Sequence, residues 1–349
     1  MAPEVRSRMP VDRLARIVAV ATSLVCSAGT AAAAVGQEDE MIFFRIATGG
    51  VNGTYHPIGA IIGNAISTPQ GSRPCAEGGS CGVYNLIAAA VSSHGSVANV
   101  EAIEAGMVES GFAQADVVHD AFYAEGAFSN RRPMRNLRVI ANLYPERMQV
   151  VVRAGAGIAS VRDLPGRRVS LDDPGSGTLP MARMVLRAYG IDESGLTVDF
   201  LKAGPAAARM QRGELDAFFF VAGVPTNVVA DLLLDRTADL VPLEEEVIGK
   251  VLAQHPFLSA SPIPADTYRQ GDPEVPSIGV GAQWIVAASI PDDRVYAICR
   301  ALWNDATRAL LDVGHPAGRQ IRLETALAGI DIPVHPGALR CYEDLGIRP

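Results

Sequence analysis

A unit of strand, glycine-rich turn and helix recurs along this chain, and it constrains the fold more than any other feature. Its first occurrence is Phe43–Ile66, with the sequence FFRIATGGVNGTYHPIGAIIGNAI. Aromatic and β-branched residues at 43–47 predict a buried strand, and Gly49, Gly50 and Gly53 allow a tight reversal. Apolar residues at helical spacing after Tyr55 predict an amphipathic helix. Because a helix N-terminus attracts anions, this corner is suited to binding a ligand.

This corner has two other interpretations. The plain one is a strand-to-helix turn that binds nothing. A dinucleotide-binding turn is disfavoured, because Gly49, Gly50 and Gly53 do not have G-x-G-x-x-G spacing and no acidic residue ends a following strand about 20 residues later. Repetition of the unit downstream favours the ligand-binding interpretation.

Similar units follow in both halves of the chain. Strands are expected at 86–92, 110–113, 167–171, 197–201 and 217–221. Each is followed by polar or glycine-rich residues and then by a helix; Ser96 is expected to cap one of these helices, which Gly106 ends. Alternation of strand and helix predicts parallel sheets that bind ligands at the carboxyl ends of their strands.

Two series of such units, divided near residue 148, predict an α/β fold of two lobes. Extended runs at 137–143 and 149–152 are separated by a turn expected at Pro145, and the run 278–289 is expected to cross back to the first lobe. Together they form a two-strand hinge that permits closure over a guest. A helix is expected over 292–311 and a surface loop over 256–276. Predicted lobe 1 is 35–148 plus 286–349, and lobe 2 is 149–285.

The N-terminus has the pattern of a secretory signal peptide. Arginines precede an apolar run at 17–25 and a tract of small residues at 27–34. The sequence therefore predicts a signal peptide over 1–34, cleavage near Ala33 or Ala34, and a periplasmic location. A single membrane anchor would need a longer apolar run. Lipidation at Cys26 is disfavoured, because Val25 is bulkier than such cleavage sites accept.

Composition and cysteines narrow the partners. The 349 residues are 48% hydrophobic and 19% charged, as in a globular protein, and the net charge of −8 disfavours nucleic acid as a partner. Cys75 and Cys81 bracket a short glycine-rich loop, which predicts a local disulfide in an exported chain. Metal binding there is disfavoured because no histidine lies at ligand spacing. Cys299 and Cys341 can pair or remain free.

Several motifs, taken in order, resemble one known family. These are TGGVNGTYHPIG, SSHGSVANVEAIEAG, FAQADV, DLPGRRVSLDDPGSGT and IPVHPGALRCYEDLG. Together they resemble the TAXI-type periplasmic solute receptors of tripartite ATP-independent (TRAP) transporters, over almost the whole mature chain. The resemblance implies a type II periplasmic-binding-protein fold. It also implies that a small organic acid or amino acid, of the glutamate, dicarboxylate or oxo acid class, is captured and delivered to an ion-coupled TRAP permease in the membrane.

Candidate ligand-binding residues lie at the expected corners. A small anionic or zwitterionic metabolite is expected to meet Asn52, Thr54, Tyr55, Ser93, Ser96, Gln114, Asp116, Ser176, Gly177, Thr178, Pro225 and Thr226. The turn at 176–178 is the best carboxylate cradle, because helix dipole and N–H donors act together there. For each hydroxyl, helix capping is the alternative role. Asp116 either caps its helix or meets an ammonium group, which favours an amino acid.

Arg147 and Arg153 flank the predicted hinge, and each is expected either to reach the cleft or to lie on an exposed rim. His56 and His94 are expected to be polar loop residues and not catalytic bases. No G-x-S-x-G, H-E-x-x-H or Cys–His signature is present, so no catalytic residue, metal or cofactor is predicted. A receptor is expected and not an enzyme. An exported enzyme acting on a small acid, and a ligand sensor, are the alternatives, because architecture alone does not decide function.

Overall fold

The computed structural model describes residues 40–348, which belong to one compact unit. The predicted signal peptide and its cleavage site lie outside the described residues. None of the helices within 40–348 is both long and apolar enough to cross a membrane.

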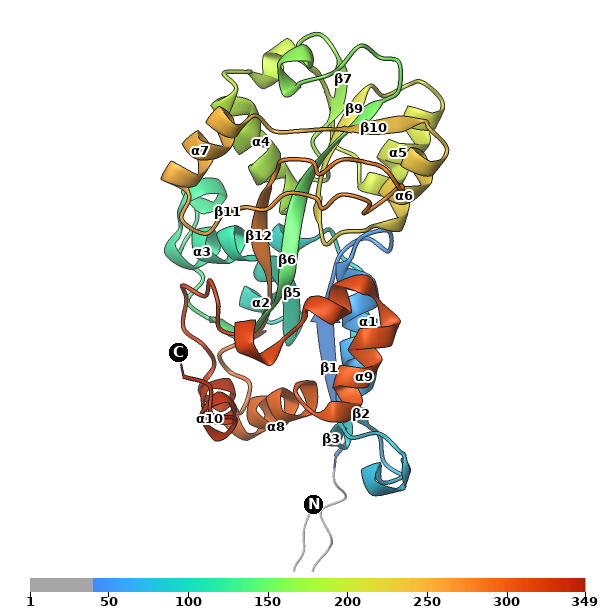
Figure 1. Ribbon diagram of the computed structural model, residues 1–349. Helices are drawn as coiled ribbons and strands as arrows, with labels where there is room; N and C mark the ends of the chain where they lie inside the picture. The colour runs from blue at the N-terminus through green and yellow to red at the C-terminus, as the bar shows by residue number, and fades with distance from the viewer. Residues whose placement is uncertain (1–39, 349) are drawn as a thin grey trace, which may run out of the picture. The chain divides into compact units, whose positions relative to one another are not determined.

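One large mixed sheet organises the structure (Figure 1). Its strand order is β4-β1-β5-β12-β6-β9-β7-β8, with β10 beside β6 and β11 beside β12. The strands are β1 (Ile42–Ala47), β4 (Leu86–Val91), β5 (Ser110–Gln114), β6 (Leu137–Arg153), β7 (Arg168–Ser170), β8 (Thr197–Asp199), β9 (Ala217–Ala222), β10 (Ala238–Val241), β11 (Ser259–Ala260) and β12 (Ile278–Ala287). A separate small sheet pairs β2 (Ser67–Thr68) with β3 (Val83–Tyr84).

Helices follow the strands as the alternation predicted. They are α1 (Tyr55–Ile66), α2 (Ser96–Glu104), α3 (Ala115–Tyr123), α4 (Thr178–Ala188), α5 (Ala203–Gln211), α6 (Asn227–Leu234), α7 (Glu245–Gln254), α8 (Asp292–Leu302), α9 (Asp305–Gly314) and α10 (Pro336–Asp344). We call β1, β4, β5, α1–α3 and α8–α10 the first lobe, and β7–β10 with α4–α7 the second (Figure 1).

The two longest strands join the lobes. Strand β6 pairs antiparallel with β12 from Leu137 to Arg147, and then with β9 from Arg147 to Val152. In the first lobe, strands β4, β1 and β5 run parallel to one another. In the second lobe, strands β9, β7 and β8 run parallel to one another. The α/β class with two lobes and a two-strand hinge is therefore confirmed. The division at 148 and 286 stays a prediction, because β6 and β12 belong to both lobes.

Each lobe has its own apolar core. In the first lobe Trp284 packs edge-on against Phe44 and Phe112, with ring centroids 6.5 and 6.2 Å away. In the second, Phe219 and Val169 of the sheet pack with Val185 of α4. Separate cores allow the lobes to move as units about the strands between them.

The predicted turn at Pro145 is wrong. Pro145 lies within β6, opposite Gly281 of β12. A proline lacks the N–H that an interior strand donates to its partners. It is tolerated here because pairing with β9 begins only at Arg147.

Two further expectations need correction. The helix expected over 292–311 is two helices, α8 and α9, because Asn304 accepts a hydrogen bond from Thr307 N (2.8 Å) and starts a new one. The loop at 256–276 is more than surface loop. It contains β11 and a bridge between Ile263 and Val275.

Two disulfides are present within residues 40–348. Cys75 and Cys81, the pair expected to form a local clamp, are bonded with an S–S distance of 1.99 Å. Cys299 of α8 is bonded to Cys341 of α10, which the sequence had left open. Cys299–Cys341 ties together two helices of the first lobe, with the Cα atoms 6.3 Å apart.

Candidate functional site

A cavity of about 270 Å³ lies where the corners of the two lobes meet. Its walls come from the turn after β1, the starts of α2, α4 and α5, and the ends of β5 and β9, with one residue from β6. The polar and charged lining is Asn52, Thr54, Tyr55, Ser92, His94, Ser96, Gln114, Glu146, Asp172, Ser176, Thr178 and Lys202. The volume is at the small end of the roughly 300–1,000 Å³ of ligand pockets, so a small metabolite fits it best.

The first corner is formed by the turn between β1 and α1. Gly53 N donates to Gly50 O (2.9 Å), which closes the reversal. Thr54 then donates through Oγ1 to Gly223 O of the second lobe (3.0 Å). The hydroxyl of Thr54 therefore bridges the lobes at the cavity and can offer a ligand only its acceptor lone pairs.

A buried hydrogen-bonded cluster forms the first-lobe wall. The Tyr55 hydroxyl donates to Glu146 Oε2 (2.7 Å) and lies 3.3 Å from Ser96 Oγ. Ser96 Oγ in turn accepts from Gln114 N (3.1 Å). Ser96 therefore links α2 to β5 and does not cap its own helix as predicted; Gly95 takes the N-cap position.

Glu146 is the acid of this cluster. Its side chain comes from the hinge strand β6 and is 2% exposed. Burial raises the pKa of Glu146 to about 8, the hydrogen bond from Tyr55 opposes that rise, and the charge of Asp116 adds to it. Burial also raises the pKa of Tyr55, which keeps its hydroxyl a donor.

The second-lobe wall is the turn between β7 and α4. Asp172 has a φ of 73°, a backbone conformation that residues other than glycine rarely adopt. Burial raises the pKa of Asp172 to about 6, although hydrogen bonds from Asp173 N–H and from Thr178 act to lower this pKa. Thr178 Oγ1 also accepts from Val221 N (3.1 Å), and Ser176 Oγ accepts from Leu179 N (3.2 Å).

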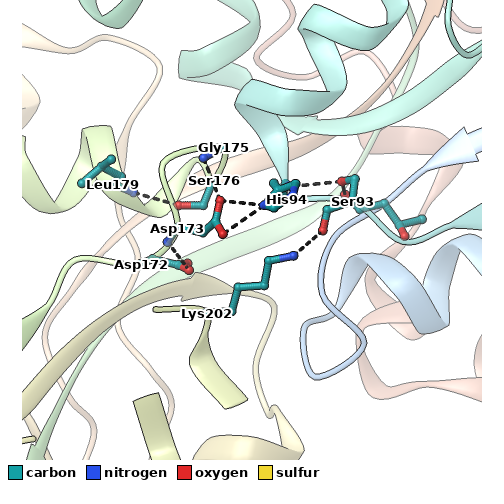
Figure 2. Close-up of polar contacts among 10 residues, drawn as sticks. Ser93, His94, Asp172, Asp173, Gly175, Ser176, Leu179 and Lys202 are labelled. Carbon is teal, nitrogen blue, oxygen red and sulfur yellow. Dashed lines mark hydrogen bonds and ion pairs between the residues drawn. The ribbon is translucent and has the colours of Figure 1, made fainter. Parts of the chain in front are cut away.

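Charged contacts join the rims (Figure 2). His94 Nδ1 of the first lobe lies 2.9 Å from Asp173 Oδ1 of the second. Lys202 Nζ donates to Ser93 O (2.9 Å) from the start of α5. Ala98 N donates to Gly175 O (3.0 Å) nearby. The lobes therefore touch on several sides of the cavity.

Two glycines permit this approach. Gly95 has a φ of 120°, and a Cβ there would lie 3.1 Å from Ser176 Cα. A Cβ on Gly177 would lie 2.3 Å from Gln114 Oε1 and 2.8 Å from Ser96 Oγ. Any larger residue at Gly177 would displace the side chains of Gln114 and Ser96 or hold the lobes apart.

The structure brings together most of the residues predicted to bind a ligand. Those that line the cavity are Asn52, Thr54, Tyr55, Ser96, Gln114, Ser176, Gly177 and Thr178. Their role as ligand contacts stays a prediction, as does that of the four considered next.

Four predicted residues do not line this cavity. Ser93 Oγ donates to Thr48 O, and its carbonyl receives Lys202. Asp116 lies at the start of α3 on a second cavity of about 690 Å³. Pro225 and Thr226 follow β9 beyond the lining, where the buried Thr226 contacts the hydroxyl of Tyr268. Asp116, Pro225 and Thr226 lie two to four residues beyond the last lining residue of their segments. Ser93 lies between Ser92 and His94, which line the cavity, but its side chain bonds to Thr48 O.

The chemical groups that sequence reasoning missed are the charged ones. Lys202 and Asp172 were given no ligand-binding role, and Glu146 lies beside the expected Pro145 turn. Arg147 and Arg153 are occupied elsewhere, with Pro262 O (2.9 Å) and Asp216 (2.9 Å). Within residues 40–348, no group of three or more His, Cys, Asp or Glu side chains is arranged to bind a metal.

Solved structures resemble this fold at low sequence identity. A protein of Bordetella bronchiseptica RB50 is 14% identical, with 88% of this chain and 90% of that chain covered and a TM-score of 0.50. MatC from Rhodopseudomonas palustris with bound malate is 11% identical (79% and 89% covered, TM-score 0.48). The alkanesulfonate-binding protein SsuA from Xanthomonas axonopodis pv. citri bound to MOPS is 16% identical (88% and 91% covered, TM-score 0.44). The first of these likenesses concerns the fold alone, and it agrees with the two-lobed α/β fold described above.

A family model also matches most of the chain. Residues 46–346 match the model of the NMT1-like family. That range includes every strand of the large sheet except the first residues of β1, and all residues that line the cavity. The chain therefore belongs to the NMT1-like family.

Proposed function

We propose that this protein is the periplasmic solute receptor of a TAXI-type TRAP transporter. It captures a small organic acid or amino acid between its lobes and delivers it, unaltered, to a permease subunit in the membrane. The observation that carries the proposal is the cavity of about 270 Å³, enclosed by corners from both lobes that contact each other across it. A guest held there is released when the hinge opens.

The chemistry of the wall supports an acidic guest. Four helices begin at the cavity, at Tyr55, Ser96, Thr178 and Ala203. Unpaired N–H groups of helix starts attract anions, and Lys202 adds a positive charge. The order of the five motifs quoted in the sequence analysis supports the TAXI assignment.

A hydrolase is the alternative from another class, and the His94–Asp173 pair is its best starting point. His94 Nδ1 is held by Asp173, as in a catalytic dyad. Within the described part of the chain, however, no hydroxyl is hydrogen-bonded to His94 Nε2. Without a nucleophile beside the base, the pair supports contact between the lobes better than it supports catalysis.

Mass spectrometry of small molecules released from the purified protein tests the proposal. We expect one small acid, bound one to one, that raises the melting temperature when it is added back. A second arm tests the partner: the liganded protein should bind TRAP permease in detergent or nanodiscs. A protein that carries no ligand, and whose melting temperature no amino or organic acid changes, would contradict the receptor assignment.

A further inference from the structure

The second cavity, of about 690 Å³, lies between α3 of the first lobe and α4 of the second (Figure 1). The segment after α7 also lines it, and there the Phe257 ring lies against the His119 ring with centroids 4.2 Å apart. This cavity shares no lining residue with the smaller one. It is therefore a separate site between the lobes, which the proposed function does not use.

Three acids form a row along the first-lobe wall of this cavity. They are Asp116 and Asp120 of α3, and Glu125 just beyond that helix. Burial raises the pKa of Asp116 to about 7, and the charge of Asp120 adds to the rise. Burial also raises the pKa of Asp120, and the charge of Glu125 adds to that rise. Neighbouring acids in the row therefore lie close enough to repel each other.

Asp116 has an oxygen without a partner. The residue is 7% exposed, and among residues 40–348 no group donates a hydrogen bond to its buried Oδ1. A buried carboxyl oxygen without a donor is costly and uncommon in native proteins. Because the Asp116 side chain lines the second cavity, the missing donor is expected to come from a guest there.

Two arginines of the cavity are paired with acids outside the row. Arg131 pairs with Glu101, and Arg183 Nε lies 2.5 Å from Glu193 Oε1. Arg187 is exposed on α4 and forms no ion pair with another described residue. The row of acids is therefore not neutralised by paired arginines.

His255 shows where the unpaired arginine lies. Burial lowers the pKa of His255, the charge of Asp120 opposes this effect, and the charge of Arg187 adds to it. Asp120 and Arg187 therefore approach His255 from opposite walls of the cavity. A cation held by Asp120 would be repelled by Arg187.

We infer that the second cavity binds a linear di- or polyamine, whose ammonium groups meet Asp116 and Asp120. These acids are four residues apart on α3, so they lie on one face of the helix and about 6 Å apart along its axis. An extended putrescine molecule places its two ammonium groups at a similar separation. Leu179, Pro180 and Met184 of α4 supply an apolar surface for the methylene groups. A metal ion fits less well, because no three acid, histidine or cysteine side chains converge within residues 40–348.

Calorimetry with the mature protein tests this site. Putrescine, spermidine and butylamine are titrated at pH 8, where Asp116 is largely ionised, in about 150 mM salt to screen weak surface contacts. We expect putrescine and spermidine to bind at one site per chain. Butylamine has the carbon chain of putrescine but one ammonium group, and should bind about tenfold more weakly or worse.

Four variants locate the site. Asp116→Asn and Asp120→Asn keep the shape of the side chain, and each should lose roughly 10–100-fold in putrescine affinity. Asp235→Asn removes an exposed acid at the end of α6 and is the matched control, which should bind like the wild type. Arg187→Gln removes the opposing charge and should bind putrescine up to about fivefold more tightly.

Three results would overturn the polyamine site. One is that butylamine binds as tightly as putrescine, and another is that Asp235→Asn loses as much affinity as Asp120→Asn. Either would mean that amines are attracted by the overall negative charge of the protein. The third is the absence of saturable binding of putrescine and spermidine. None of these results bears on the receptor assignment, which depends on the smaller cavity.

Discussion

The corner turns and the hinge strand line one cavity but differ in chemistry. The corners contribute glycines, hydroxyl groups, helix starts and Lys202, and they come from both lobes. Strand β6 contributes Glu146, a buried carboxyl that can change its charge. The corners therefore bring the two lobes into contact around the cavity, whereas the hinge strand places an ionisable carboxyl in the wall between them. The following predictions separate these two roles.

The largest effect is expected at a corner, for Gly177→Ala. Its added Cβ would lie 2.3 Å from Gln114 Oε1 of the other lobe, so the methyl group opposes closure. Overpacking of this kind costs roughly 1–3 kcal/mol, which corresponds to about 5–150-fold in affinity. Titration calorimetry measures the loss. Because the lobes can relax by opening, the melting temperature of the unliganded protein should change little.

Gly195→Ala is the matched control for this substitution. No atom lies within 4 Å of a Cβ at Gly195, so its affinity should equal that of the wild type. Equal affinity of Gly177→Ala and the control would show that close contact of these corners is not needed for binding.

The hinge strand gives the opposite pattern, a gain of stability. The unfolded Glu146 has its ordinary pKa near 4.5 and the folded one is near 8, so between these pH values the folded state binds more protons. Its contribution to stability therefore falls as pH rises from about 4.5 to about 8. Glu146→Gln removes this dependence, and its melting temperature should exceed that of the wild type by a few degrees at pH 8 but not at pH 4.5. A difference independent of pH would contradict the assignment of a buried neutral acid.

A smaller effect is expected for the hydroxyl at the second-lobe corner. Thr178→Ala removes hydrogen bonds to Val221 N and Asp172, and should weaken ligand binding roughly tenfold. Thr178→Ser keeps the hydroxyl and should bind like the wild type. If the alanine variant loses melting temperature in proportion to affinity, Thr178 acts only as a structural cap.

The smallest effect is expected at the rim. His94 and Asp173 form an exposed pair between the lobes, and such pairs contribute at most about 1 kcal/mol. His94→Ala should weaken binding about fivefold or less, mainly through faster dissociation, as stopped-flow kinetics can measure. Lys250→Ala removes an exposed pair with Glu246 inside α7 and serves as control. A loss as large as that of Gly177→Ala would mean that His94 contacts the ligand.

The contrast between corners and hinge also explains what the sequence could predict. Strand, glycine turn and helix are local patterns, so Tyr55, Ser96, Gln114 and Thr178 were located correctly. Their hydrogen-bond partners could not be located in this way. Ser96 was expected to cap α2, but its Oγ accepts a hydrogen bond from Gln114 N at the end of β5. Such contacts depend on how strands pair, which local patterns do not specify.

Glu146 was missed for a specific reason. Pro145 was interpreted as a turn, which placed Glu146 outside any strand, whereas β6 continues through both residues. The polar residue between two apolar extended runs was the available signal. Asp116 shows the limit of local patterns: it follows a strand end as expected, but it lies on the second cavity and not on the first.

The most direct test of the account compares native mass spectra of the wild type and Gly177→Ala, purified side by side. We predict that the wild type carries one small acid per chain, recovered chemically unchanged after prolonged incubation, and that the variant carries much less. Equal occupancy of both proteins, or conversion of the bound molecule into a product, would contradict the claim that closure of the two lobes captures a solute without altering it.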